Sequence, residues 1–95
     1  MATATRQAAD KLDNAYDCYA KDMGDGFNQP AWMEAYDLRE DGYDLAEKAY
    51  ALPADLRDAW VEAETDKHSE SARYLVSCAV DFRLAELAAA EQVAA

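Results

Sequence analysis

Residues 71–91 read SARYLVSCAVDFRLAELAAAE, a stretch rich in alanine, leucine and valine. On a helix built from this stretch, apolar side chains cover more than half of the circumference. A helix that is apolar nearly all round is typical of one surrounded by other helices. The stretch therefore predicts an all-α fold in which the last helix is central.

The rest of the chain also has helical spacing. Apolar residues recur every three or four positions over residues 5–23, 28–52 and 53–63, as on one side of a helix. Gly24 and Gly26 end the first segment, whereas Pro30 and Pro53 suit the first turns of the next two. We expect a single domain over residues 1–95, with a polar linker at 64–70 and a frayed alanine-rich tail at 92–95.

Gly42 leaves the number of helices open. One glycine inside a helix costs about 1 kcal/mol relative to alanine, so the second helix either continues through Asp41-Gly42 or kinks there. A hairpin at this dipeptide would need alternating strands on both sides, and the flanking residues do not alternate. The sequence predicts a bundle of four helices, or five if the chain breaks at Gly42.

The charge of the chain is concentrated in its middle. The net charge is −11, and residues 24–66 carry −9 of it, whereas residues 1–23 and 67–95 carry −1 each. So acidic a surface excludes direct binding to phosphate backbones or to anionic membranes, both of which require Lys and Arg. Adaptation to high salt would spread the acids over every helix, so we expect a local role for the excess.

The acids of the middle region have helical spacing on two successive helices. Neighbours three or four positions apart lie roughly 5–6 Å apart at Cβ, and adjacent antiparallel helices pack about 8–10 Å apart. The two rows therefore predict an array of negative charge that resembles a nucleic-acid backbone. The candidate partner-binding residues are Asp37, Glu40, Asp41, Asp44, Glu47, Asp55, Asp58 and Glu62.

Aromatic residues are also frequent in this region. Trp32, Tyr36, Tyr43, Tyr50 and Trp60 are expected mostly in the core, because bundle helices need large apolar side chains. In addition, Phe27 directly follows Gly26 in a glycine-containing loop and is the candidate for an exposed aromatic anchor.

The sequence carries few signs of catalysis or metal binding. His68 is its one histidine, and we expect it to be an exposed linker residue. Residues 22–28 resemble a calcium loop only loosely, because they lack acids at alternate positions ahead of the glycine. We expect no enzyme activity, no metal and no cofactor.

The ends and the cysteines indicate an intracellular protein. The N-terminal residues lack the apolar stretch of a signal peptide, and no apolar run approaches the roughly 18 residues of a membrane span. Cys18 and Cys78 are therefore expected as reduced thiols, each packing as a small hydrophobe.

In overall character the chain resembles the small phage- and plasmid-encoded inhibitors of bacterial defence, namely anti-CRISPR proteins and DNA-mimic antirestriction proteins. The resemblance rests on the acidic rows quoted above. It implies a protein in the bacterial cytoplasm that binds a CRISPR effector complex, or another basic nucleic-acid enzyme, and blocks its access to DNA. The alternative is a helical interaction module or subunit that binds, or forms a homodimer, through apolar surface, with the charge serving solubility.

Overall fold

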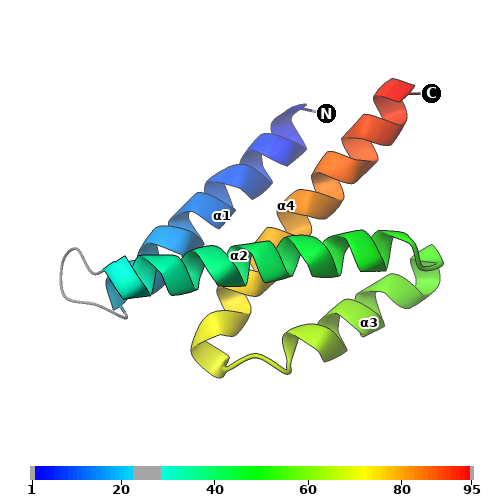
Figure 1. Ribbon diagram of the computed structural model, residues 1–95. Coiled ribbons are helices and arrows are strands. Elements are labelled where there is room, and N and C mark those ends of the chain that lie inside the picture. Colours follow the sequence, from blue (N-terminus) through cyan, green and yellow to red (C-terminus); the bar gives the residue numbers. More distant parts are fainter. Residues whose placement is uncertain (1, 23–28, 95) are drawn as a thin grey trace.

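The computed structural model describes residues 2–22 and 29–94 and consists there of helices joined by short turns (Figure 1). The helices are α1 (Ala2–Asp22), α2 (Gln29–Tyr50), α3 (Ala54–Thr65) and α4 (Glu70–Ala94). Over these residues there is no strand. The all-α class expected from the sequence is confirmed.

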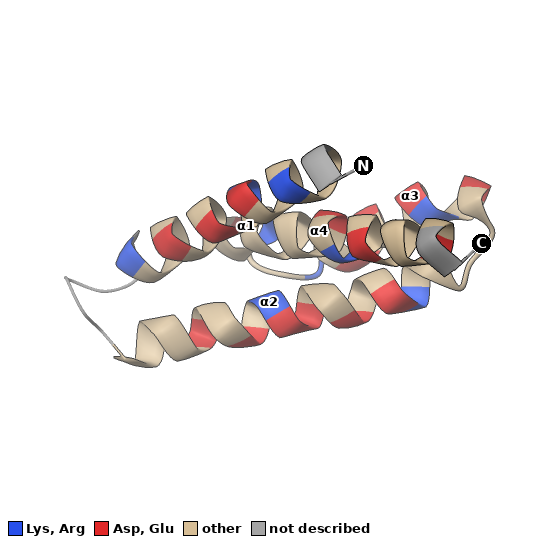
Figure 2. Ribbon diagram, turned by 90° about the horizontal axis from the view of Figure 1, so that it is seen from above, with Lys and Arg blue, Asp and Glu red and all other residues tan. Residues whose placement is uncertain are grey.

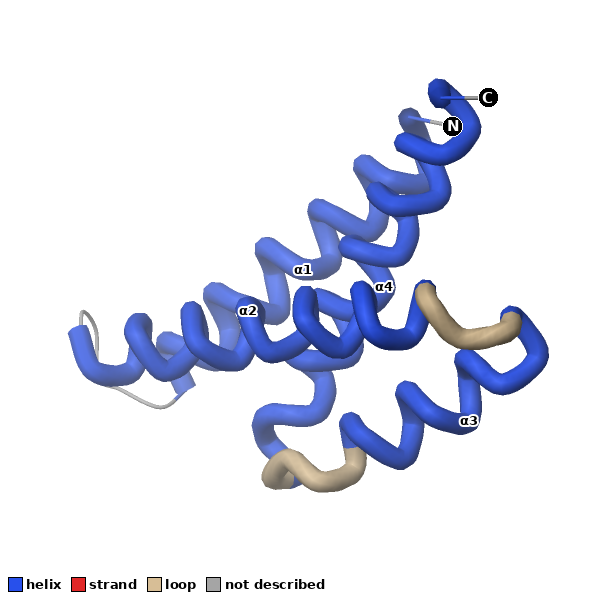
Figure 3. Tube along the Cα trace, turned by 45° about the vertical axis from the view of Figure 1, so that its right-hand side comes forward, coloured by secondary structure: helices blue, strands red, loops and turns tan. Residues whose placement is uncertain are grey.

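The helices form a flat arrangement rather than a round one. The Cα atoms extend over 46 × 28 × 15 Å. α1 and α4 lie antiparallel, so that the start of α1 and the end of α4 are on the same side of the molecule, and α3 returns antiparallel beside α2 (Figures 1 and 3). Both α2 and α4 contact each of the other three helices, whereas the described parts of α1 and α3 do not contact each other. The central position expected for the last helix is thus shared with α2.

The core consists of a few branched side chains among many alanines. Leu75, Val76 and Val80 on α4 are the largest side chains that are fully buried. Many of the other buried residues are alanines, including Ala35 and Ala46 on α2. Because alanine side chains are short, the helix backbones can approach one another closely. Much of the stability therefore depends on tight helix contact.

Gly42 lies at a close approach of α2 to α4. It is buried, and α2 continues as a helix on both sides of it, so the break considered from the sequence does not occur. A Cβ atom at Gly42 would lie 2.5 Å from Ala79 Cβ and 2.9 Å from the Val76 carbonyl oxygen on α4. The glycine is therefore explained by the crossing of α2 over α4, which leaves no room for a side chain.

Aromatic side chains join α1 to α2. The rings of Tyr16 and Trp32 lie 5.6 Å apart between centroids, and the Tyr16 hydroxyl donates to the Trp32 carbonyl oxygen over 3.3 Å. Tyr19 is buried and donates a hydrogen bond of 2.8 Å to Glu34 Oε1. Burial and this hydrogen bond raise the pKa of Tyr19 to about 12. These contacts hold the end of α1 against the start of α2.

The two cysteines differ in their surroundings. Cys78 is buried in the core, as expected, and its burial raises the pKa of the thiol. Cys18 is exposed, so the expectation that it packs as a small hydrophobe was wrong. Its position on α1 falls on the polar side of that helix, beside Asp17, whereas Ala15 and Tyr19 face the core.

None of the helices, over the residues described, combines the length and the apolar character needed to cross a membrane.

Candidate protein-binding surfaces

The acids of α2 lie on the side of that helix that faces solvent. Its buried residues recur at helical spacing, and the carboxylates occupy other positions around the helix. Figure 2 shows the acidic positions following one another along α2. We call this set the outer row, and all of its members are exposed: Asp37, Glu40, Asp41, Asp44 and Glu47.

Of the three cationic side chains in the acidic middle region, two make contacts with other residues of the fold. The Arg39 guanidinium lies over the rings of Tyr16 and Tyr36, 4.8 and 5.1 Å from their centroids. Arg57 on α3 donates hydrogen bonds to the carbonyl oxygens of Ala49 and Tyr50, each over 3.0 Å. These carbonyls lie at the end of α2, where helical partners run out, and the Ala49 carbonyl also accepts a hydrogen bond from the Leu52 N–H over 3.0 Å. Lys48 is therefore the cation of this region that remains exposed beside the outer row.

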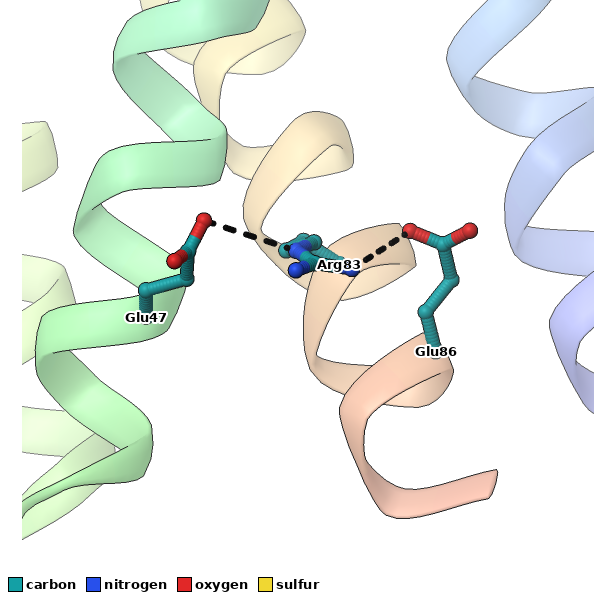
Figure 4. Close-up of polar contacts among 3 residues, drawn as sticks. All are labelled: Glu47, Arg83 and Glu86. Carbon is teal, nitrogen blue, oxygen red and sulfur yellow. Dashed lines mark hydrogen bonds and ion pairs between the residues drawn. The ribbon is translucent and has the colours of Figure 1, made fainter. Parts of the chain in front are cut away.

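Ion pairing neutralises only one end of the outer row. Arg83 on α4 lies 3.6 Å from a Glu47 carboxylate oxygen and 3.2 Å from a Glu86 carboxylate oxygen (Figure 4). The remaining ion pair in the described part of the chain joins Lys67 to Glu64. The other four acids of the outer row have no ion-pair partner within the described residues, so their charge is presented to solvent.

The acids of α3 lie elsewhere. Asp55 is in the first turn of α3, where a negative charge interacts favourably with the helix dipole. Asp58 and Glu62 line a groove between α3 and α4 with a volume of about 420 Å³. We call it the α3–α4 groove, and it is lined by Asp58, Val61, Glu62, Thr65, Asp66, Arg73, Tyr74, Ser77, Val80, Asp81 and Leu84.

A second, smaller hollow lies beside the outer row. Its volume is about 230 Å³, and it lies between α2 and the residues that connect α3 to α4. Asp41 and Asp44 of the outer row line it, together with Lys48, Lys67 and His68. The two hollows share none of their described lining residues. The structure thus brings Asp41 and Asp44 together at one hollow, and Asp58 and Glu62 together at another.

Residues outside the sequence-based selection complete the α3–α4 groove. Asp81 and Tyr74 of α4 and Thr65 of α3 line it, and the sequence singled out none of them as a site. Desolvation raises the pKa of Asp81, and the Asp58 carboxylate raises it further, whereas Lys11 of α1 lowers it. Only the packing of α3 against α4 brings these groups together, so no sequence spacing could reveal them.

A few large apolar side chains remain exposed near the acids. Met33 and Tyr36 lie one turn apart on α2 and are 60% and 48% exposed. Leu56 on α3 and Tyr74 on α4 are 54% and 61% exposed. Methionine and tyrosine are frequent in the centres of protein interfaces. Tyr36 departs in this respect from the buried role expected for most aromatic residues of the region.

His68, Phe27 and residues 22–28 are the remaining positions to which the sequence drew attention. His68 is half-buried rather than exposed, because the turn between the helices folds its side chain against the molecule. Phe27 and most of the loosely calcium-like stretch 22–28 lie outside the described residues. Among the residues that the structure does describe, no three His, Cys, Asp or Glu side chains gather in a way that could hold a metal ion.

Comparison of the chain with protein-family models, with curated proteins and with solved structures found no match.

Proposed function

We propose that this protein is a non-enzymatic inhibitor whose acidic surface occupies a basic nucleic-acid-binding groove on a partner protein. The observation that carries the proposal is the outer row of α2, five exposed carboxylates in a segment whose arginines are bound inside the fold. Such a surface offers a continuous negative field to a Lys- and Arg-lined groove. Electrostatic complementarity of this kind accelerates association and selects cationic partners.

The scaffold suits this role. In the proposal, the four helices act as one small bundle that holds the outer row in a straight line, since α2 is a single helix of 22 residues. A rigid row limits the entropy lost when the partner binds. Met33 and Tyr36 lie beside the acids and would add apolar contact at the same interface. The partner class is a CRISPR effector or another nucleic-acid enzyme in the cytoplasm of a bacterial host.

The proposal is tested by capture followed by competition. The tagged protein is used to retain partners from a bacterial lysate, and the retained protein is identified by mass spectrometry and purified. Duplex DNA is then added to the purified complex. We expect the DNA to displace the inhibitor, and the affinity of the complex to fall about tenfold or more between 50 and 200 mM salt. A complex that withstands both treatments would contradict the proposal.

A second function is favoured by the exposed apolar side chains. In this alternative the chain is an interaction module or a homodimer that associates through Met33, Tyr36, Leu56 and Tyr74. Apolar association persists when charge is screened, whereas the acidic interface weakens. Sedimentation equilibrium of the purified protein at rising salt separates the two. A dimer that strengthens with salt supports the alternative.

A further inference from the structure

The α3–α4 groove combines an apolar floor with an acidic rim. Val61 of α3 and Val80 and Leu84 of α4 supply apolar lining, and Asp58 and Asp81 lie on opposite sides. This combination matches a long cationic side chain, because such a side chain buries its carbon stem on apolar surface while its charged head stays near carboxylates.

A buried hydroxyl in the groove lacks a hydrogen-bond partner. Thr65 is 8% exposed, lines the groove, and its Oγ1 atom is buried without any partner among the described residues. A buried polar atom without a partner costs roughly 1–3 kcal/mol. A ligand that donates a hydrogen bond to Thr65 Oγ1 would recover that cost, which makes the hydroxyl a second and independent indication of a binding site.

The groove also lacks a free cation of its own. Arg73 is its one basic residue among those described, and its guanidinium donates to the carbonyl oxygens of His68 and Asp66 over 3.2 and 3.3 Å. Burial is the main cause of the raised pKa of Asp81, Lys11 on α1 lowers that pKa, and repulsion from the Asp58 carboxylate across the groove raises it by a smaller amount. A cation placed between the two carboxylates would relieve this repulsion.

We propose that the α3–α4 groove binds an arginine side chain inserted by the basic protein partner. The stem packs on Val61 and Leu84, which are only partly buried, and the guanidinium donates hydrogen bonds to Asp58, Asp81 and Thr65 Oγ1. Arginine is favoured over lysine because its planar fork carries five N–H donors and is more weakly hydrated, and because it stacks on aromatic rings such as that of Tyr74. The inference rests on the proposed function, since it assumes a basic partner, and it adds a second point of contact away from the outer row.

The test uses the full chain, isotopically labelled, and an acetyl-Gly-Arg-Gly-amide peptide followed by NMR. We expect saturable shifts at Thr65 and at the side-chain carboxyl carbons of Asp58 and Asp81. The matching lysine peptide and spermidine should bind at least about fivefold more weakly, and a citrulline peptide should not bind. Equal affinity for lysine or spermidine would overturn the assignment to arginine, and shifts confined to the outer row would overturn the groove.

Variants separate binding from folding. Thr65→Val keeps the shape but removes the hydroxyl, so we expect the melting temperature to stay level or rise while arginine binding weakens about threefold to tenfold. Asp58→Asn with Glu62→Gln should abolish the shifts. Asp13→Asn with Asp17→Asn on α1 removes the same charge at the same helical spacing and should change the affinity less than about twofold.

Unchanged binding in the Thr65→Val protein, or equal loss in the α1 control, would overturn the inference. Its failure is distinguishable from failure of the proposed function. The groove is tested by the peptide and by groove variants, whereas the proposed function is tested by the outer row on the intact partner. A groove that ignores arginine leaves the outer-row result unaffected.

Discussion

The two sides of α2 differ in burial and in charge. The inner side consists of Ala35, Gly42, Ala46 and other small residues that are completely or nearly completely buried against α4. The outer side, only half a turn away, carries the exposed carboxylates of the outer row. Changes on the inner side should therefore act on stability, and changes on the outer side should act on binding.

Polar groups at the two ends of α2 contact neighbouring helices, as the inner side does. Glu34 is an acid of α2, yet it accepts a hydrogen bond from Tyr19 on α1, and the last carbonyls of α2 accept hydrogen bonds from Arg57 on α3. Polar character by itself therefore does not identify the binding surface. What distinguishes the outer row is charge without a partner on a neighbouring helix, except at Glu47.

The largest effect on stability is expected at the helix crossing. Gly42→Ala places a Cβ atom 2.5 Å from Ala79 Cβ, which forces α2 and α4 apart. Overpacking of this kind costs about 1–3 kcal/mol or more, and the better helix propensity of alanine offsets about 1 kcal/mol. We expect a net loss of about 2 kcal/mol in the free energy of unfolding, measured by urea denaturation.

A double-mutant cycle identifies the cause of that loss. Ala79→Gly removes the atom that the new Cβ meets, so Gly42→Ala should cost less in the Ala79→Gly background than in the wild type. A coupling of about 1 kcal/mol is expected for residues in such direct contact. Costs that simply add would show that the contact with Ala79 Cβ is not the reason for the loss, since the Val76 carbonyl oxygen remains 2.9 Å from the new Cβ in both backgrounds.

A smaller loss is expected at the end of α2. Arg57→Met keeps much of the side-chain volume but removes the side-chain donor to the carbonyls of Ala49 and Tyr50, and among the described residues only the Ala49 carbonyl keeps a backbone donor, the Leu52 N–H. We expect Arg57→Met to lower the free energy of unfolding by about 1 kcal/mol. Arg57→Lys should have a stability between those of the wild type and the Met variant, because an ammonium group can donate hydrogen bonds but not as a planar fork. Thermal unfolding by circular dichroism measures both. A Met variant as stable as wild type would exclude this role for Arg57.

Tyr19→Phe should cost somewhat less, about 0.5–1 kcal/mol at pH 8, through loss of the hydrogen bond to Glu34. The loss has a defined pH dependence. Because the pKa of Tyr19 is raised from 10.0 to about 12 on folding, its contribution is fully present below pH 10 and declines as the pH rises from 10 to 12. The stability difference between wild type and Tyr19→Phe should therefore shrink over this range, and a constant difference would contradict the account.

Much of the fold could be predicted from local spacing, because each helix alternates core and solvent positions over several turns. The ends of the helices were close to those expected from Pro53 and from the apolar periodicity. The role of Gly42 could not be predicted from local spacing. The local cost of the glycine favours a break, and only the close approach of Ala79 on a distant helix explains why this position of a continuous helix is a glycine.

The candidate site was less accessible to sequence reasoning. The exposure of the outer row follows from periodicity, since the acids avoid the positions of Ala35 and Ala46. The orientation of α3 does not follow, because its apolar residues point in several directions and Leu56 remains exposed. For the same reason the meeting of Asp58, Thr65 and Asp81 in one groove depends on tertiary packing alone.

The smallest effect on stability is expected on the outer side of α2. Asp37→Asn with Asp44→Asn should change the free energy of unfolding by less than about 0.5 kcal/mol, since exposed charges without partners contribute little. Urea denaturation of this variant beside Gly42→Ala completes the comparison of the two sides. A loss as large as that of Gly42→Ala would mean that the outer row also supports the fold.

The central claim is tested most directly by reversing charge on two helices in a matched way. Asp37→Lys with Asp44→Lys changes the outer row, and Asp10→Lys with Asp17→Lys makes the same change at the same spacing on α1, where all four positions are exposed. The affinity of each protein for the purified partner is measured by titration calorimetry at low salt. We expect the α2 variant to lose at least about a hundredfold in affinity and the α1 variant less than about threefold. Equal losses in the two variants would contradict the account.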